Sequence, residues 1–369
     1  MGTIYRHFIR PVLFRMDPEL AHRIAVRACD IAGHSNLLRS IVRPRLTVTN
    51  SRLEQTIGGV RFENPIGLAA GFDKNGYAVE MLGAFGFGHV EIGSISAFPS
   101  KGNPSPRLFR IPNDKGIVVN YGVPNEGADR VAKRLGQKQW MVPLGINLVK
   151  TNDSSRPTSD EEVIGDYATS FGRLQGYGSY VSLNMSCPNS PNDRNYFDDL
   201  TKVDALLQRL SRSSPQLPVF LKLKPTTDKG ILKETVAIAD RYPFVAGFGI
   251  NLPAGKPAEL IFATSQKVLA RLPGSVSGRP VEGLINSNLR LLYEVIGRQS
   301  RYRLMAAGGV FSAADAYRKI RLGASLVQIY TALVYYGPGV VKEILEGLLE
   351  LLSRDGFRQI SDAVGEDVR

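Results

Sequence analysis

Eight short apolar runs, each followed by a segment of helical character, occupy the chain from residue 60 onward. Buried parallel strands read as continuous apolar runs, and eight of them alternating with helices favour a closed (β/α)8 barrel. A doubly wound open sheet is the competing architecture, but no GxGxxG motif opens the first strand-to-helix turn. Two long irregular stretches, 97–135 and 252–286, are candidate active-site loops. We therefore predict an α/β protein with a (β/α)8 barrel, built from PIGLAAG (65–71), HVEIGSIS (89–96), WMVPLGINLV (140–149), YVSLNMS (180–186), VFLKLKP (219–225), AGFGIN (246–251), RLMAAGG (303–309) and LVQIYTAL (326–333).

The first forty residues have a different pattern, with two amphipathic segments that are rich in arginine. In TIYRHFIRPVLFRM, apolar residues recur at helical spacing and arginines occupy positions between them. In DPELAHRIAVRACDIA, Asp17 is placed to cap a helix whose first residue is Pro18. Such helices either pack on their own domain or lie on a membrane surface, and periodicity alone leaves both open. We divide the chain into an N-terminal amphipathic helical segment, residues 1–42, and a barrel domain, residues 43–369.

The formal net charge of +12 indicates an anionic partner, unless the basic surface only keeps the protein soluble. Such a partner could be nucleic acid, an anionic membrane surface or a small acidic substrate. The chain has no recognisable nucleic-acid motif and no interleaved basic and aromatic patch, so we expect no nucleic-acid partner. It also has no run of about 18 apolar residues and no apolar core of a signal peptide, so we expect a soluble or peripheral protein.

Cysteine and histidine usage argues against disulfides and metal sites. Only Cys29 and Cys187 are present, far apart in the sequence, so neither a disulfide framework nor a zinc ligand set is predicted. The four histidines show no HExxH or paired-ligand spacing, and we expect no protein-bound metal. A reducing compartment fits this composition best.

Polar residues follow the predicted strands at their carboxyl ends, where a barrel carries its reactive groups. A half-buried polar group there must be hydrogen-bonded, either by neighbours or by a ligand. Gly308 and Gly309 end the seventh run and Tyr330 and Thr331 lie in the eighth, and the loops after these strands often bind phosphate. The polar residues at the other strand ends are Lys74, Asn147, Asn184 with Cys187, Lys222 and Asn251.

Several motifs together resemble, in order and spacing, the dihydroorotate dehydrogenases: AAGFDKNG, GFGHVEIGSIS, GNPSPRLFR, NMSCPNS, AAGGV and GASLVQIYTAL. Members of that family are FMN enzymes built on a (β/α)8 barrel, and they oxidise dihydroorotate to orotate in pyrimidine biosynthesis. The likeness covers nearly the whole chain. DPELAHRIAVR resembles the N-terminal extension of the membrane-associated, quinone-reducing class 2 members. The resemblance implies a membrane quinone as partner, peripheral membrane contact through the N-terminal helices, and a place at the cytoplasmic side of the inner membrane or in the cytoplasm.

Carried over position by position, the resemblance implies three groups of site residues. Lys74 would lie between flavin and substrate, where its charge stabilises the reduced flavin. Carboxamides supply both donors and acceptors to a ring that bears imide groups and a carboxylate. The residues implied for FMN are Ala70, Gly71, Ser94, Asn147, Lys222, Ser277, Gly278, Gly308, Gly309, Tyr330 and Thr331; those for dihydroorotate are Lys74, Asn184, Asn189 and Asn251; those for quinone are His22, Arg110 and Tyr330.

The resemblance makes Cys187 the catalytic base that removes a proton from dihydroorotate while hydride leaves for the flavin. Class 2 members usually have serine at this position, and cysteine is typical of class 1. The chain thus resembles class 2 at its N-terminus and class 1 at its base. A thiol is the easier base, because its ordinary pKa of about 8.5 lies far below that of a serine hydroxyl.

Two positions depart from the family pattern and leave the substrate open. Val119 stands where the family usually has asparagine, with the nearest amide one residue along at Asn120, and Leu252 stands where it usually has threonine or serine. Each change leaves a polar group of the substrate unpaired, at about 1 to 3 kcal/mol. A different small ring or an enone-like compound is therefore an alternative substrate, and a barrel that binds FMN without turnover is a third reading.

Overall fold

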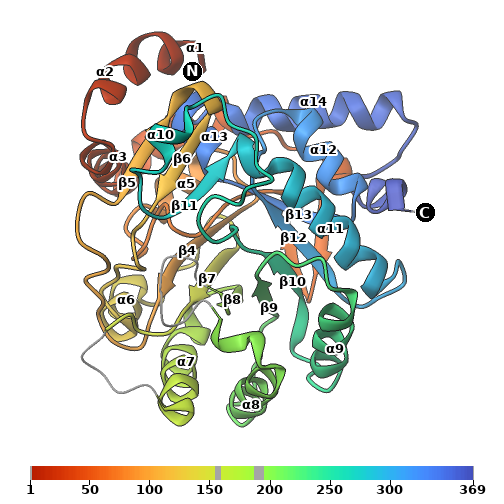
Figure 1. Cartoon of the computed structure of the whole chain (residues 1–369). Coiled ribbons are helices and arrows are strands. Elements are labelled where there is room, and N and C mark those ends of the chain that lie inside the picture. Colours follow the sequence, from red (N-terminus) through yellow and green to blue (C-terminus); the bar gives the residue numbers. More distant parts are fainter. Residues whose placement is uncertain (1, 154–158, 187–194, 369) are drawn as a thin grey trace.

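The computed structural model describes residues 2–153, 159–186 and 195–368. Eight parallel strands close into a barrel in the order in which the chain reaches them, with the last pairing with the first (Figure 1). Each of the eight predicted runs supplies one strand, so the predicted barrel is confirmed. The strands are β3 (Ile66–Leu68), β4 (His89–Ile95), β7 (Leu144–Leu148), β8 (Tyr180–Asn184), β9 (Val219–Leu223), β10 (Val245–Ile250), β12 (Arg303–Ala307) and β13 (Ala324–Ile329).

Helices surround the barrel because their apolar faces cover the outward side chains of the strands. In α7, Ser159 caps the first turn and Glu162 completes a capping box, while Tyr167 and Phe171 are buried. The last predicted run, 326–333, is only partly a strand, because a short helix begins at Thr331. The outer helices are α5 (Val79–Ala84), α6 (Ala128–Leu135), α7 (Asp160–Leu174), α8 (Leu200–Ser211), α9 (Lys229–Asp240), α11 (Glu282–Ile296), α12 (Ala313–Arg321) and α14 (Val340–Arg354), and two further short helices are α10 (Gln266–Leu269) and α13 (Thr331–Tyr336).

A two-stranded hairpin of β1 (Gln55–Ile57) and β2 (Val60–Phe62) precedes the barrel. Gly58 and Gly59 both have positive φ, which the two-residue turn between the strands requires. Ile57 and Phe62 pack on a buried cluster that contains Tyr180, Phe220, Met305 and Leu326. The hairpin therefore covers the interior of the barrel at the amino ends of its strands.

The two stretches predicted to be irregular are in fact partly ordered as a second sheet. Strands β5 (Leu108–Ile111), β6 (Gly116–Val119) and β11 (Ser275–Gly278) form a three-stranded antiparallel sheet near the carboxyl ends of the barrel strands (Figure 1). The prediction was wrong here because each strand has four residues, too few for a periodic pattern. Pairing between β6 and β11, which are far apart in the sequence, fixes these strands.

The N-terminal residues form the two predicted helical segments and one more helix, and α3 packs against α5 and β5. Asp17 accepts a hydrogen bond from the Leu20 amide at the start of α3, as predicted from its position before Pro18. Residue 42, where the first sequence segment was drawn to end, lies inside α4. The elements are α1 (Gly2–Ile4), a π-helix (Tyr5–Ile9), α2 (Arg10–Arg15), α3 (Pro18–Gly33) and α4 (Asn36–Leu46).

Candidate active site

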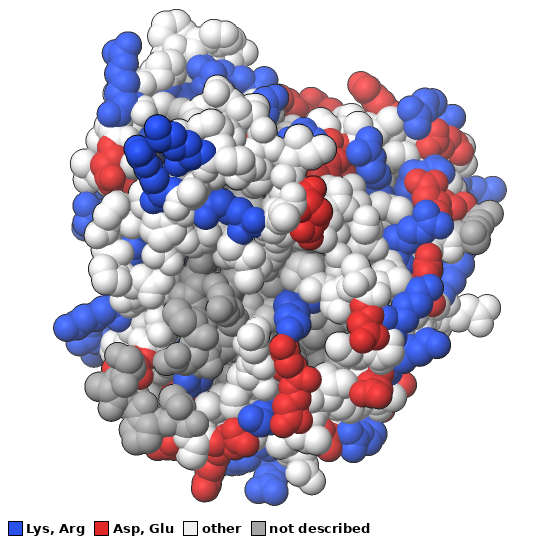
Figure 2. All heavy atoms as spheres, viewed as in Figure 1, with Lys and Arg blue, Asp and Glu red and all other residues white. Residues whose placement is uncertain are grey.

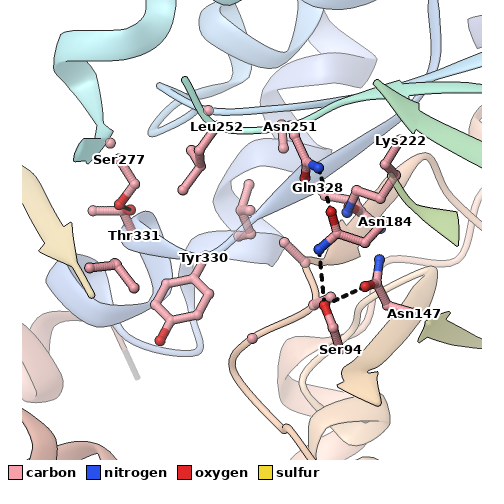
Figure 3. A pocket seen from close by; sticks show the side chains of 18 of the residues that line it. Ser94, Asn147, Asn184, Lys222, Asn251, Leu252, Ser277, Gln328, Tyr330 and Thr331 are labelled. Carbon is pink, nitrogen blue, oxygen red and sulfur yellow. Dashed lines mark hydrogen bonds between the residues drawn. The ribbon is translucent and has the colours of Figure 1, made fainter. Parts of the chain in front are cut away.

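A cavity lies at the carboxyl ends of the barrel strands, and residues of the three-stranded sheet also line it. Figure 3 shows many of the side chains around it. Every residue that the resemblance implied for FMN lines it, and so do three of the four implied for the substrate. The predicted base Cys187 and the fourth residue implied for the substrate, Asn189, lie outside the described residues. The predicted residues that line the cavity are Ala70, Gly71, Lys74, Ser94, Asn147, Asn184, Lys222, Asn251, Ser277, Gly278, Gly308, Gly309, Tyr330 and Thr331.

A chain of hydrogen bonds joins four polar side chains on one wall of the cavity (Figure 3). The Asn251 amide donates to Asn184 Oδ1 over 2.6 Å, and the Asn184 amide donates to Ser94 Oγ over 3.2 Å. The Ser94 hydroxyl in turn donates to Asn147 Oδ1. These side chains come from the ends of four strands, so the barrel geometry fixes their relative positions, and each amide keeps capacity for a ligand.

An ion pair between Glu91 and Lys222, which was not predicted from the sequence, lies next to this wall in the barrel interior. Glu91, on β4, accepts a hydrogen bond from Lys222 Nζ over 3.1 Å and one from the Asn147 amide over 2.8 Å. Gln328, on β13, donates to the same carboxylate and lines the cavity. The sequence did indicate such a contact, because a Glu and a Gln inside otherwise apolar buried runs need hydrogen-bond partners.

Several glycines also line the cavity, and their exposed backbone matches a flat or phosphorylated cofactor. Gly71, Gly278, Gly308 and Gly309 all have positive φ and line the cavity. A Cβ on Gly278 would lie 2.4 Å from the Lys115 carbonyl oxygen, so no other residue fits the close approach of these loops. Backbone amides that are not covered by side chains can bind phosphate oxygens directly. The residues present therefore fit FMN.

Lys74 lines the cavity, but its ammonium points toward the N-terminal helices. Its Nζ lies 3.3 Å from His22 Nε2 and 4.0 Å from the ring centroid of Tyr121. Burial lowers the pKa of Lys74 to about 8. Burial, and then the Lys74 ammonium, lower the pKa of His22 well below its ordinary value, so the imidazole is neutral. Lys74 thus links the cavity to helix α3.

Val119 and Leu252, the two departures from the family pattern, both line the cavity. The neighbouring Asn120 does not replace the missing amide, because its side-chain oxygen accepts a hydrogen bond from Asn103 Nδ2 over 3.0 Å. It is also not among the residues that line the cavity. The cavity therefore has apolar side chains at both positions.

A second cavity lies between the N-terminal helices and the barrel, and its walls are almost entirely apolar. The three residues implied for quinone, His22, Arg110 and Tyr330, all line it. Arg110 donates to the Met16 carbonyl over 3.1 Å, and its guanidinium stacks on the Phe14 ring, 4.6 Å from the centroid. Tyr330 lines both cavities, so the two cavities are adjacent at this residue.

The outer face of the N-terminal helices exposes apolar side chains. Among the residues that the structure describes, ten of the fifteen large apolar side chains that are exposed lie between Ile4 and Ile41. Phe8, Leu37 and Ile31 are the most exposed of the ten, at 71%, 68% and 62%. In the described part of the chain, no helix has the length and apolar character needed to cross a membrane.

The fold and the cavity define a (β/α)8-barrel enzyme whose site lies at the carboxyl ends of its strands. The family model for dihydroorotate dehydrogenase matches residues 52–352. A dihydroorotate dehydrogenase (quinone) from Acidithiobacillus ferrooxidans is 39% identical over 368 residues, covering 97% of this chain and 98% of the relative. One from Natronomonas pharaonis is 35% identical over 360 residues, with 98% of each chain covered. The crystal structure of dihydroorotate dehydrogenase from Eimeria tenella in complex with ferulenol has a TM-score of 0.81 at 26% identity, covering 96% of each chain. The chain belongs to the dihydroorotate dehydrogenase family.

Proposed function

We propose that this chain oxidises dihydroorotate to orotate with FMN as its cofactor and passes the electrons to a quinone. The observation that carries the proposal is the convergence of the residues implied for flavin and substrate on one cavity, next to a separate apolar cavity. The names of the two relatives above, both dihydroorotate dehydrogenase (quinone), support the same reaction.

The glycines that line the cavity, together with Asn147 and Lys222, would hold FMN. When bound, it supplies the acceptor for the hydride that leaves the substrate. The Lys222 ammonium favours negative charge on the flavin ring, and Ser277 and Thr331 supply hydroxyl groups whose oxygens lie 3.3 Å apart.

The amount of flavin released on heating tests this assignment. The purified protein should release about one FMN per chain, and Lys222→Ala should release much less.

Dihydroorotate would be held by the carboxamides of Asn184 and Asn251, which offer donors and acceptors to its imide groups. Asn189, by resemblance, would add a third amide. The Cys187 thiolate would take the proton from the substrate carbon next to the one that loses hydride. Binding in this cavity excludes water, which strengthens each of these polar contacts.

The quinone would enter the second cavity, where apolar walls suit its ring and Arg110 and His22 face its carbonyl oxygens.

Residues 1–46, which extend to the end of α4, would then form a membrane-associated segment. This segment has eight arginines against three carboxylates, so both its charge and its exposed apolar side chains suit an anionic leaflet. Lys and Arg side chains are also prominent on the upper left of the face in Figure 2, near these helices. We propose a peripheral location at the cytoplasmic side of the inner membrane.

Ligand affinity should depend on pH through Lys74. Because its pKa is lowered to about 8 by burial, the side chain is charged below that pH and loses its charge as the pH rises through it. Binding of orotate, an anion, should therefore weaken by roughly tenfold from about pH 7 to about pH 9, the effect of one charged contact. The dissociation constant is read from the change in flavin absorbance. Lys74→Met should bind weakly at both pH values, and a wild-type affinity that stays constant would contradict the assignment.

The apolar pair Val119 and Leu252 favours a second candidate, oxidation of a less polar ring than dihydroorotate. The variant Val119→Asn distinguishes dihydroorotate from a less polar ring as the substrate. If dihydroorotate is the substrate, the new amide pairs a polar group of the ring and lowers the dissociation constant about tenfold. If the substrate is less polar, the amide weakens its binding and leaves dihydroorotate binding poor. Asn120→Val is a matched control, because Asn120 lies one residue along but does not line the cavity.

A further inference from the structure

The carboxylate of Glu91 is the most heavily hydrogen-bonded acidic group in the barrel interior that the structure describes. It lies on β4, is 0% exposed and accepts hydrogen bonds from five side chains on four other strands. Oε1 accepts from Asn147 Nδ2 (2.8 Å) and Lys222 Nζ (3.1 Å), and Oε2 accepts from Gln328 Nε2 (2.8 Å), Ser182 Oγ (3.1 Å) and Tyr180 OH (3.2 Å).

Three of the five donors, Asn147, Lys222 and Gln328, line the first cavity, whereas Glu91 does not. Glu91 therefore lies one layer deeper than the residues that would touch FMN. A carboxylate accepts only, so each of the three cavity residues must turn its N–H or ammonium group toward it. For Asn147, the amide nitrogen faces Glu91 and the amide oxygen accepts from Ser94, which fixes the orientation of the whole side chain.

Glu91 is also the counter-charge of Lys222, whose side chain is itself almost fully buried. Burial raises the pKa of the Glu91 carboxyl. The charge of Lys222 and the hydrogen bonds from Gln328 and Asn147 lower that pKa by more, so it lies below its ordinary value. The carboxylate is therefore ionised at neutral pH. A buried pair of this kind is costly to break, because removal of one partner leaves the other charge uncompensated.

We propose that Glu91 is a positioning residue of the flavin site, which orients Asn147, Lys222 and Gln328 and offsets the charge of Lys222, and so sets both the affinity for FMN and its reduction potential. The inference rests on the proposed function, since it requires FMN in the first cavity. It goes beyond that function because Glu91 touches neither flavin nor substrate and acts only through the residues above it.

Glu91→Gln keeps the shape of the side chain and removes its charge. Its new NH2 group faces donors instead of offering an acceptor, so at least one of the cavity residues loses its partner. We expect the dissociation constant of FMN to rise roughly tenfold. The charge of the Lys222 ammonium is no longer offset in this variant, so the midpoint potential of bound FMN should shift to more positive values.

Tyr180→Phe is the matched control. It removes one hydrogen bond to the same carboxylate but changes no charge and no residue that lines the cavity. This variant should lose thermal stability while its FMN dissociation constant and midpoint potential stay close to those of the wild type. If Glu91→Gln and Tyr180→Phe shift the potential equally, Glu91 has only a structural role and the proposal fails.

A second variant covers the case in which Glu91→Gln alone does not fold. Glu91→Gln combined with Lys222→Gln replaces the ion pair by a neutral pair, which buried sites often tolerate. With FMN in excess, Lys222→Gln alone leaves the Glu91 carboxylate without its counter-charge, so the midpoint potential of FMN in this single variant should be more negative than in the double variant; equal potentials in these two variants would overturn the proposal. A wild-type chain that binds no FMN would overturn both proposals, whereas wild-type and Glu91→Gln chains with equal affinity and potential would overturn this one alone.

Discussion

Cys187→Ala is expected to slow the reduction of bound flavin by dihydroorotate about a thousandfold, while FMN stays bound. A positioned general base contributes about 10² to 10⁴ to the rate of proton transfer, and alanine removes it entirely. Anaerobic stopped-flow absorbance measures this step separately from quinone turnover. The flavin content of the variant should equal that of the wild type, because the residues implied for FMN are unchanged.

Cys187→Ser is the informative control for this result. The hydroxyl has a much higher pKa than a thiol, so the serine variant should be slower than the wild type at neutral pH and should continue to gain rate as the pH rises. It should still exceed the alanine variant, since serine is the usual residue of class 2 members. An alanine variant as fast as the wild type would remove Cys187 from the mechanism.

Ala25→Trp is expected to abolish most quinone turnover and to leave flavin reduction by dihydroorotate intact. Ala25 lines the second cavity, on the face of α3 that points toward the barrel, and the indole ring would fill the space that a quinone ring needs. A loss of about 3 kcal/mol in the binding free energy of the quinone corresponds to a KM for quinone raised roughly a hundredfold. Steady-state reduction of a short-chain quinone measures the effect without a membrane.

Arg23→Trp supplies the matched control for Ala25→Trp, because Arg23 is exposed on the same helix and does not line the second cavity. It introduces the same side chain at the surface, and turnover of the short-chain quinone should stay near the wild-type value. If both tryptophan variants lose turnover equally, the loss reflects damage to α3. If neither loses turnover, the quinone does not use this cavity.

The barrel and much of its site were predictable because each depends on local sequence. Buried parallel strands are apolar along their whole length, and their carboxyl ends meet at one rim, so Asn147, Asn184 and Lys222 were expected to lie together. The three-stranded sheet was missed because its short strands are fixed by pairing between distant segments. No local pattern encodes such a pairing.

The electrostatic part of the site was harder to predict. Glu91 lies within the apolar run HVEIGSIS, but its partners come from four other strands, and only the closed barrel brings them to one carboxylate. Lys74 lines the cavity as predicted, but the contacts of its ammonium with His22 and Tyr121 were not predicted. The packing of α3 determines the contact between Lys74 and His22, and the AAGFDKNG motif alone does not predict it.

Anaerobic stopped-flow mixing of the purified protein with dihydroorotate tests the central claim most directly. The account predicts that the flavin absorbance bleaches rapidly on mixing and returns when a quinone is added. A flavin that stays oxidised with dihydroorotate, yet bleaches with dithionite, would contradict the proposed substrate while leaving the fold and the cofactor site in place.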